Sequence, residues 1–262
     1  MIILKEPWEL GVMRNAGRRL AEVVARLREV VSEGMETRDL DRMAEEAILA
    51  LGARPAFKGY APEKTPFPAS LCVSINEQVV HGVPGRRRLD PGDVVSLDFG
   101  LVYGGYYADT AFTVVLPPVS DADRMLVEAT EAAMHAGIAC ARVGGRVGDI
   151  GHAVETYCKA RQLGVVRKFV GHGIGKRLHE EPSVPNFGKA GTGPLLKPGM
   201  VLAIEPMITL GGEDTKILPD RWTVVTKDNS RSAHFEHTVA ITPSGPEILT
   251  VLESPAAPGV RT

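Results

Sequence analysis

Hydrophobic residues recur every three or four positions in the first part of the chain, which is the spacing of one helical face. The pattern covers residues 7–33, where Pro7 suits a first helical turn. It resumes at Thr37, a suitable N-cap, and continues to Leu51. A stretch rich in proline and glycine follows at 53–70, and its length is more typical of a functional loop than of a simple connector. The pattern therefore predicts two helices and then a loop.

Apolar runs that follow this loop predict β-strands. Tyr103-Gly104-Gly105 separates two of these runs and indicates a hairpin. In this half of the chain the predicted strands cover residues 71–75, 79–81, 93–102 and 106–115.

The same succession of helices and strands then starts again. Ser120, with Asp123 three residues later, is typical of the start of a helix, which extends to residue 140. A further helix is predicted from Gly148 to Gly164. The second half also contains a long loop rich in glycine and proline at 173–199, and strands at 165–170, 200–206, 222–226 and 232–241.

Two segments, residues 89–98 and 196–205, share a pattern of Leu-x-Pro-Gly-x, a small or apolar run, and a final acid. A proline and glycine before a strand are common, but here the acids Asp98 and Glu205 align as well, which favours an internal duplication. We therefore predict a single domain over residues 1–262, with a pseudo-repeat of approximately 7–115 and 120–241.

The composition is that of an ordinary globular protein, with 44% hydrophobic and 24% charged residues and a net charge of −2. Arg86-Arg87-Arg88 is the one tight basic cluster, so a nucleic-acid partner is not indicated. Three cysteines without a Cys-x-x-Cys pair favour a reducing compartment. No stretch approaches the roughly 20 apolar residues of a membrane span, and we expect no membrane association and a cytoplasmic protein.

Four acids, namely Asp98, Asp109, Glu205 and Glu236, are embedded in apolar, strand-like sequence. Any one of them alone would be a solvent-facing residue or a cap. Carboxylates are almost never fully buried unless they are paired or bind a metal, and four that converge would repel one another. Their number therefore favours a pair of divalent cations between them.

Histidines next to glycine strengthen this hypothesis. His172 lies between two glycines directly after a predicted strand, His81 precedes a glycine in the first half, and His179 follows in the second. His234 and His237 flank Glu236 and could be ordinary strand residues, which we favour for His237.

Other hydrolase chemistries fit poorly. The chain contains neither a Gly-x-Ser-x-Gly nucleophile elbow nor a His-Glu-x-x-His zinc motif. A nucleophilic role remains open for Cys72, but no neighbouring residue indicates an activated thiol.

The chain resembles the type I methionine aminopeptidases of the short bacterial kind. The resemblance extends over approximately residues 7–250. The segments that carry it are Ser74–Pro84, Asp93–Asp98, Ala108–Thr110, Gly171–Gly175, His179–Pro182, Lys197–Met200, Ile204–Met207, Arg221–Thr223 and Phe235–Thr238. It implies the pita-bread fold, an α/β (α+β) architecture with pseudo-twofold duplicated halves around a curved antiparallel sheet. That architecture agrees with the duplication in the sequence.

The resemblance also implies a cofactor of two divalent metal ions, whose identity (cobalt, manganese, iron(II) or zinc) the sequence leaves open. Asp98 would bind one ion, His172 and Glu205 the other, and Asp109 and Glu236 would bridge them.

The implied reaction is removal of the initiator methionine from nascent polypeptides, by attack of a metal-activated water on the first peptide bond. Glu205 would relay a proton, and His81 and His179 would contact the substrate and the tetrahedral intermediate. Phe67 stands where the family usually has tyrosine and Leu178 where it usually has phenylalanine. The methionine pocket would be lined by Phe67, Cys72, His81, Leu178 and Trp222.

We expect a monomer whose partner is the N-terminal methionine of nascent peptides, with transient ribosome contact. Two alternatives stay open at this point. One is an X-Pro aminopeptidase or prolidase of the same fold, although those enzymes usually carry an additional N-terminal domain. The other is a non-catalytic binding protein on the same scaffold, although such a protein would be expected to have lost metal ligands.

Overall fold

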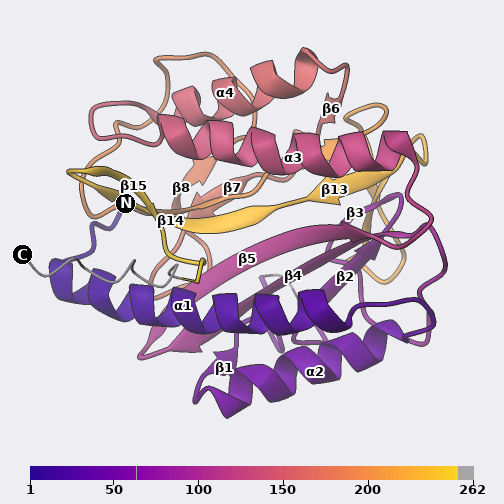
Figure 1. Ribbon diagram of the computed structural model, residues 1–262. Helices are drawn as coiled ribbons and strands as arrows, with labels where there is room; N and C mark the ends of the chain where they lie inside the picture. Colours follow the sequence, from indigo (N-terminus) through magenta and orange to yellow (C-terminus); the bar gives the residue numbers. More distant parts are fainter. Residues whose placement is uncertain (63, 253–262) are drawn as a thin grey trace, which may run out of the picture.

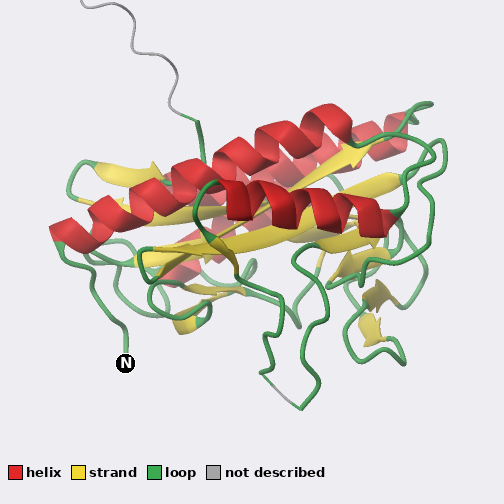
Figure 2. Ribbon diagram, turned by 90° about the horizontal axis from the view of Figure 1, so that it is seen from below, coloured by secondary structure: helices red, strands yellow, loops and turns green. Residues whose placement is uncertain are grey.

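The computed structural model describes residues 1–62 and 64–252. Four helices lie along one side of a large sheet, and most long loops extend from its other side (Figures 1 and 2). The helices α1 and α2 accompany the first-half strands, and α3 and α4 the second-half strands (Figure 1). Their bounds are α1 Pro7–Val30, α2 Thr37–Ala50, α3 Asp121–Cys140 and α4 Val147–Lys159.

The four helices form where the sequence predicts them, except that α4 ends at Lys159 and Gly164 belongs to a strand. In α1 the residues that repeat at steps of three or four, among them Met13, Leu20 and Leu27, are buried against the sheet. Ser120 caps α3, because its hydroxyl accepts the backbone N–H of Asp123 at 3.1 Å. None of the helices within the described ranges combines the length and apolar character that a bilayer crossing requires.

Nine strands form the large sheet, and every pairing within it is antiparallel. Their main order is β1-β4-β5-β14-β9-β7-β8, with β2 on β4 and β15 on β14. The bounds are β1 Arg54–Pro55, β2 Cys72–Ile75, β4 Val94–Tyr103, β5 Tyr106–Val115, β7 Gly171–Gly173, β8 Glu180–Val184, β9 Val201–Ile204, β14 Glu236–Thr242 and β15 Gly245–Ile248.

The order is symmetric about the contact between β5 and β14, which lie side by side in the middle of the molecule (Figure 1). On one side β5 pairs with β4 and β4 with β2, and on the other β14 pairs with β9 and β9 with β7. The two predicted equivalent acids thus belong to the β4 and β9 segments, one on each side of this contact.

Two small sheets complete the fold. One has the order β13-β10-β6 and the other β11-β12-β3. Their strands are β3 Gln78–Val80, β6 Gly164–Val165, β10 Met207–Thr209, β11 Thr215–Ile217, β12 Val224–Thr226 and β13 Ser232–His234.

Several boundaries differ from the prediction. The strand predicted at 165–170 is wrong beyond Val165, because Val166 and Phe169 pack in a small apolar cluster and not in a strand ladder. The strand predicted at 232–241 is two strands, since the chain leaves one sheet and enters another at Phe235. The cap predicted at Thr37 is also wrong, because Glu36 is the N-cap and the Thr37 hydroxyl accepts the backbone N–H of Gly85 at 2.8 Å.

Candidate metal centre and substrate pocket

One cavity of about 310 Å³ contains every site residue predicted from the sequence. Its polar part consists of the four acids and the histidines, and its remaining wall is apolar and aromatic. The lining residues are Phe57, Tyr60, Pro62, Phe67, Cys72, His81, Asp98, Asp109, His172, Leu178, His179, Glu205, Trp222 and Glu236.

The antiparallel pairings of the central strands bring the acids together. Asp98 lies on β4 and Asp109 on β5, and the ladder between these strands places Ala111 opposite Asp98. Ala111 is also the partner of Glu236, the first residue of β14. Glu205 follows the last residue of β9 directly. Residues separated by more than a hundred positions therefore meet at the centre of the sheet.

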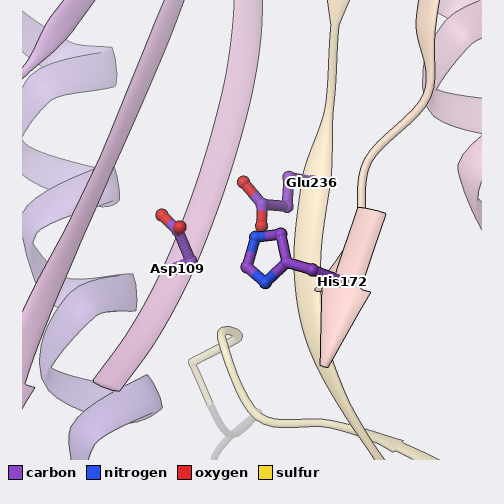
Figure 3. A group of neighbouring side chains, drawn as sticks. All are labelled: Asp109, His172 and Glu236. Carbon is purple, nitrogen blue, oxygen red and sulfur yellow. The ribbon is translucent and has the colours of Figure 1, made fainter. Parts of the chain in front are cut away.

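Three side chains form the tightest group in the cavity. Asp109, His172 and Glu236 each place one potential ligand atom within 4.8 Å of the others, and all three are buried. Figure 3 shows them pointing into the same space from β5, β7 and β14. A mixed set of carboxylate oxygens and one imidazole suits divalent transition metals such as manganese, iron, cobalt or zinc.

The backbone leaves one ring nitrogen of His172 available to a ligand. The register of β7 against β8 shifts between His172 and Gly173, an irregularity of the kind that redirects side chains next to active sites. Nδ1 of His172 donates to the carbonyl oxygen of Gly173 at 2.9 Å. Because a neutral imidazole has one N–H, Nε2 keeps a free lone pair. This Nε2 lies 3.5 Å from Oε1 of Glu205.

The glycines around His172 are required by close packing of the neighbouring strands. A Cβ atom at Gly171 would lie 2.3 Å from the carbonyl oxygen of Ala203, and one at Gly173 would lie 2.3 Å from that of Glu181. Neither glycine adopts a positive φ, so close packing and not an unusual backbone conformation accounts for both. The Gly-His-Gly sequence instead allows three strands to approach the metal site closely.

Burial and mutual repulsion raise the pKa values of the four acids. The pKa of Asp109 rises to about 7 through burial, and those of Asp98, Glu205 and Glu236 rise well above their ordinary range through burial and then through the neighbouring acids. Among the described residues, Oδ1 of Asp98 and Oε1 of Glu236 have no hydrogen-bond donor. Buried carboxylate oxygens without a hydrogen-bond donor are expected where a cation binds, so these residues fit bound metal ions.

The histidines carry no charge at neutral pH. Burial, followed by the neighbouring His179, lowers the pKa of His172 to about 3 and that of His81 to about 4. Neutral imidazoles can bind a metal or donate to a carbonyl oxygen without adding positive charge to the site.

Aromatic rings form the apolar wall of the cavity. Phe67 meets Trp222 edge-on with ring centroids 5.1 Å apart, and Phe57 meets Phe67 at 6.5 Å. Leu178 is buried on the same wall. Burial, followed by Asp98, raises the pKa of Cys72 well above its ordinary value, so the thiol is protonated and acts as a wall residue instead of a nucleophile.

His81 is held in a strained conformation at the rim of the metal site. Its φ of 59° lies in the left-handed region, which residues other than glycine seldom occupy. The ring packs edge-on against Phe169 and Trp222, with centroids 5.7 and 6.1 Å away. Such strain concentrates at functional sites.

The sequence prediction assigns no role in the site to two residues of this region. The Tyr60 hydroxyl lies 2.6 Å from Nδ1 of His179, but Tyr60 belongs to the proline-rich loop, which has no hydrophobic periodicity. His234, whose role was left open, is buried with Nε2 3.6 Å from Oε2 of Glu205. His237 pairs with the Thr250 hydroxyl at 2.8 Å, which fits the structural role favoured for it.

Comparison with known proteins agrees with this geometry. Metallopeptidase family M24 matches residues 11–243. Methionine aminopeptidase 1 of Bacillus subtilis is 48% identical over 95% of this chain and 99% of its own length, and that of Mycobacterium tuberculosis is 47% identical over 93% and 92%. The crystal structure of methionine aminopeptidase from Thermotoga maritima has a TM-score of 0.93 at 40% identity and covers 96% of this chain and 100% of that one.

Prolidases share the fold at much lower identity. The prolidase from Pyrococcus furiosus has a TM-score of 0.76 at 23% identity and covers 96% of this chain and 66% of that one. This likeness concerns the fold alone. Together the two kinds of structure confirm the predicted pita-bread fold.

Proposed function

The chain belongs to metallopeptidase family M24, and on this premise we propose that it is a methionine aminopeptidase that removes the initiator methionine from nascent polypeptides. The observation that carries the proposal is the cavity itself. Three buried carboxylates, the partly buried Glu205 and a neutral imidazole line one cavity of about 310 Å³ together with an apolar, aromatic wall. The high identity to methionine aminopeptidases favours this activity over the X-Pro alternative and over a non-catalytic binding role.

The proposed cofactor is a pair of divalent ions, of cobalt, manganese, iron(II) or zinc. Asp98 would hold one ion, and His172 with Glu205 the other. Asp109 and Glu236 are suited to bridge them, because each carboxylate has two oxygens and both residues lie in the tightest group. When bound, such a pair supplies Lewis-acid polarisation of the peptide carbonyl and lowers the pKa of an attacking water.

The protein side chains bind, orient and move protons in the proposed reaction. Glu205 lies at the edge of the acid cluster and is only partly buried, so it can accept the proton of the attacking water and pass it to the leaving amine. His179 and His81 are neutral N–H donors for the carbonyl oxygen of the first peptide bond. The apolar wall beside the acids would limit the contact of this bond with bulk water.

The pocket wall favours an unbranched apolar side chain. Phe67, Leu178 and Trp222 surround a narrow space, and Cys72 lies beside Asp98 at the boundary between wall and acids. A methionine side chain is flexible and polarisable and packs well against aromatic rings.

Location and partners belong to the same proposal. We propose that the protein acts on nascent chains in the cytoplasm, as a monomer in transient contact with ribosomes. Sedimentation with and without purified ribosomes would test the last two points.

The direct test is hydrolysis of a small peptide panel by protein reconstituted with each metal in turn. We expect methionine release from Met-Ala-Ser and Met-Gly-Ser, and none from Ala-Pro-Ser. Cleavage confined to the X-Pro peptide would reverse the assignment.

Asp109→Asn removes one carboxylate oxygen from the tightest group, and it should reduce both metal uptake and turnover by more than about 100-fold. Uptake and turnover like those of the unmodified protein would contradict the assignment of Asp109.

A further inference from the structure

His234 is a buried side chain that lacks a hydrogen-bond partner. Only 1% of the residue is exposed. Within the described part of the chain, neither Nδ1 nor Nε2 has a hydrogen-bonding partner. A buried polar group without a partner is unfavourable, so its presence in the core calls for a partner that it gains in the working protein.

Glu205 is the group that His234 faces. Nε2 of His234 lies 3.6 Å from Oε2 of Glu205, while Nε2 of His172 lies 3.5 Å from Oε1. The carboxylate therefore sits between two imidazoles, with one oxygen toward each. His172 lies within the tight group around Asp109 and Glu236, and His234 is not a member of that group. One oxygen thus faces the metal site and the other faces His234.

The backbone of His234 is fixed more firmly than its ring. Its N–H donates to Oγ1 of Thr113 at 3.0 Å, and the same hydroxyl donates to its carbonyl oxygen at 2.8 Å. Met207 lies opposite it in the pairing of β10 with β13. A rotation of the imidazole or of the Glu205 carboxylate can shorten the 3.6 Å separation to a hydrogen bond without movement of the strand.

We infer that His234 is a positioning residue, whose Nε2–H donates to Oε2 of Glu205 and fixes the carboxylate so that Oε1 is directed at the metal site. The inference rests on the proposed function, because it concerns a ligand of the proposed centre. It assigns to His234 the role that partners of metal ligands commonly have, which is to orient the ligand and set its affinity.

Two substitutions separate hydrogen bonding from packing. His234→Gln keeps an N–H donor of similar reach, and His234→Leu fills similar space without a donor. We expect His234→Leu to weaken Mn²⁺ binding, measured by titration calorimetry, by about 10- to 100-fold. Its kcat on Met-Ala-Ser should fall by about tenfold or more, with KM nearly unchanged because the pocket wall is intact. His234→Gln should remain within about threefold of the unmodified protein in both measurements.

Two other outcomes of these measurements would overturn the inference. Native Mn²⁺ affinity in His234→Leu would show that Glu205 needs no support from this ring. Equal impairment of His234→Gln and His234→Leu would show that the imidazole acts through its shape or binds the metal itself. If the leucine variant fails to fold, nitrogen NMR of the unmodified protein with bound Zn²⁺ decides the matter, because a proton on Nδ1 instead of Nε2 contradicts the proposed donor.

The metal titration also separates this inference from the proposed function. Absence of methionine release by the unmodified protein would reject the function while the Mn²⁺ affinities of the variants still report on His234. Methionine release together with unaltered Mn²⁺ affinity in His234→Leu would reject the positioning role alone.

Discussion

At the scale of single residues, the proposed chemistry depends on which ring nitrogen of His179 carries the proton. We expect Tyr60 to influence this, because its hydroxyl is 2.6 Å from Nδ1. Burial raises the pKa of Tyr60, so the phenol keeps its proton and can donate it to Nδ1. The proton of the neutral imidazole then belongs on Nε2, where it can serve as a donor to the substrate carbonyl.

Tyr60→Phe should therefore impair turnover more than binding. Loss of the hydroxyl frees Nδ1 to carry the proton, and a fraction of the molecules would present no donor at Nε2. We expect kcat on Met-Ala-Ser to fall about 5- to 30-fold, the equivalent of one hydrogen bond of about 1–2 kcal/mol, with KM changed by less than about threefold. Steady-state kinetics at saturating metal would measure both.

A tautomer measurement provides the control for this prediction. In the unmodified protein, nitrogen NMR of His179 should show the proton on Nε2, and in Tyr60→Phe a mixture of the two tautomers. An unaltered tautomer combined with a raised KM would mean that Tyr60 acts only as part of the pocket wall.

Tyr60 is also an example of a site residue that the sequence alone does not identify. The five proposed metal ligands could be predicted because each stands in an apolar run, where an unpaired carboxylate or a glycine-flanked histidine is anomalous. Tyr60 stands in a proline-rich loop whose path no hydrophobic period specifies, and tyrosine is ordinary in such a loop. The sequence identifies His234 as a histidine close to the proposed ligand Glu236. Its position beside Glu205 depends on the break between two strands at Phe235, and the continuous strand-like sequence does not reveal that break.

At the scale of elements, the start of α1 is tied to the rest of the fold by Glu9. Oε2 of Glu9 accepts the backbone N–H of Glu6 at 2.8 Å and closes a capping box. Its other oxygen accepts the hydroxyl of Tyr106 on β5 and lies 3.2 Å from Nζ of Lys176. The Tyr106 hydrogen bond, and then that of Glu6, lowers the pKa of Glu9 from 4.5 to about 2.

Glu9→Gln should therefore destabilise the protein in a pH-dependent way. A carboxyl whose pKa is lower in the folded state adds stability above its unfolded value of 4.5 and loses that contribution as the pH falls toward 2. We expect the variant to be about 1–2 kcal/mol less stable at pH 7. The difference should shrink on acidification below pH 4.5.

Urea unfolding of both proteins without metal, between neutral and acidic pH, would measure this difference. Comparing the two proteins at each pH cancels the contributions of the acids in the metal site, which are common to both. A difference that stays constant from pH 7 to pH 3 would mean that the charge of Glu9 does not contribute.

The elements themselves were predictable to very different degrees. All four helices could be located from the sequence, α3 from the capping signal at Ser120 and the others from their apolar period or the glycines at their ends. The long hairpin of β4 and β5 was also clear from its apolar runs around two glycines. Strands of two to four residues, such as β6 and β11, are too short to establish a period, and distant partners determine whether they pair.

At the scale of the whole molecule, the site is assembled by pairings between distant parts of the chain. The alignment of Asp98 with Glu205 in the sequence anticipated this convergence, because equivalent positions on either side of a symmetric sheet can face the same space. The pocket wall required more than that alignment. Phe67, Leu178 and Trp222 come from loops that have no counterpart in the repeated pattern, and Cys72 comes from β2.

One buried ion pair links the N-terminal segment to the loop that carries His179. Nζ of Lys5 lies 2.8 Å from Oε2 of Glu180, and the two side chains are 4% and 1% exposed. Oε1 of Glu180 accepts the backbone N–H of Arg177 at 3.1 Å. Glu180 follows His179 directly, so the pair fixes one border of the candidate site to a segment that precedes α1.

Lys5→Met should destabilise the metal-free protein by about 3–5 kcal/mol, because it leaves the Glu180 carboxylate buried without its cation. Adding Glu180→Gln removes the buried charge that has lost its partner and keeps an oxygen for the Arg177 N–H, so the double variant should recover more than half of the loss.

Lys58→Met is the matched control, because the pair between Lys58 and Glu45 is exposed and should contribute less than about 1 kcal/mol. Urea unfolding of the four proteins would measure these changes. If Lys5→Met and Lys58→Met cost the same, or if Glu180→Gln adds to the loss, the buried pair does not anchor the loop.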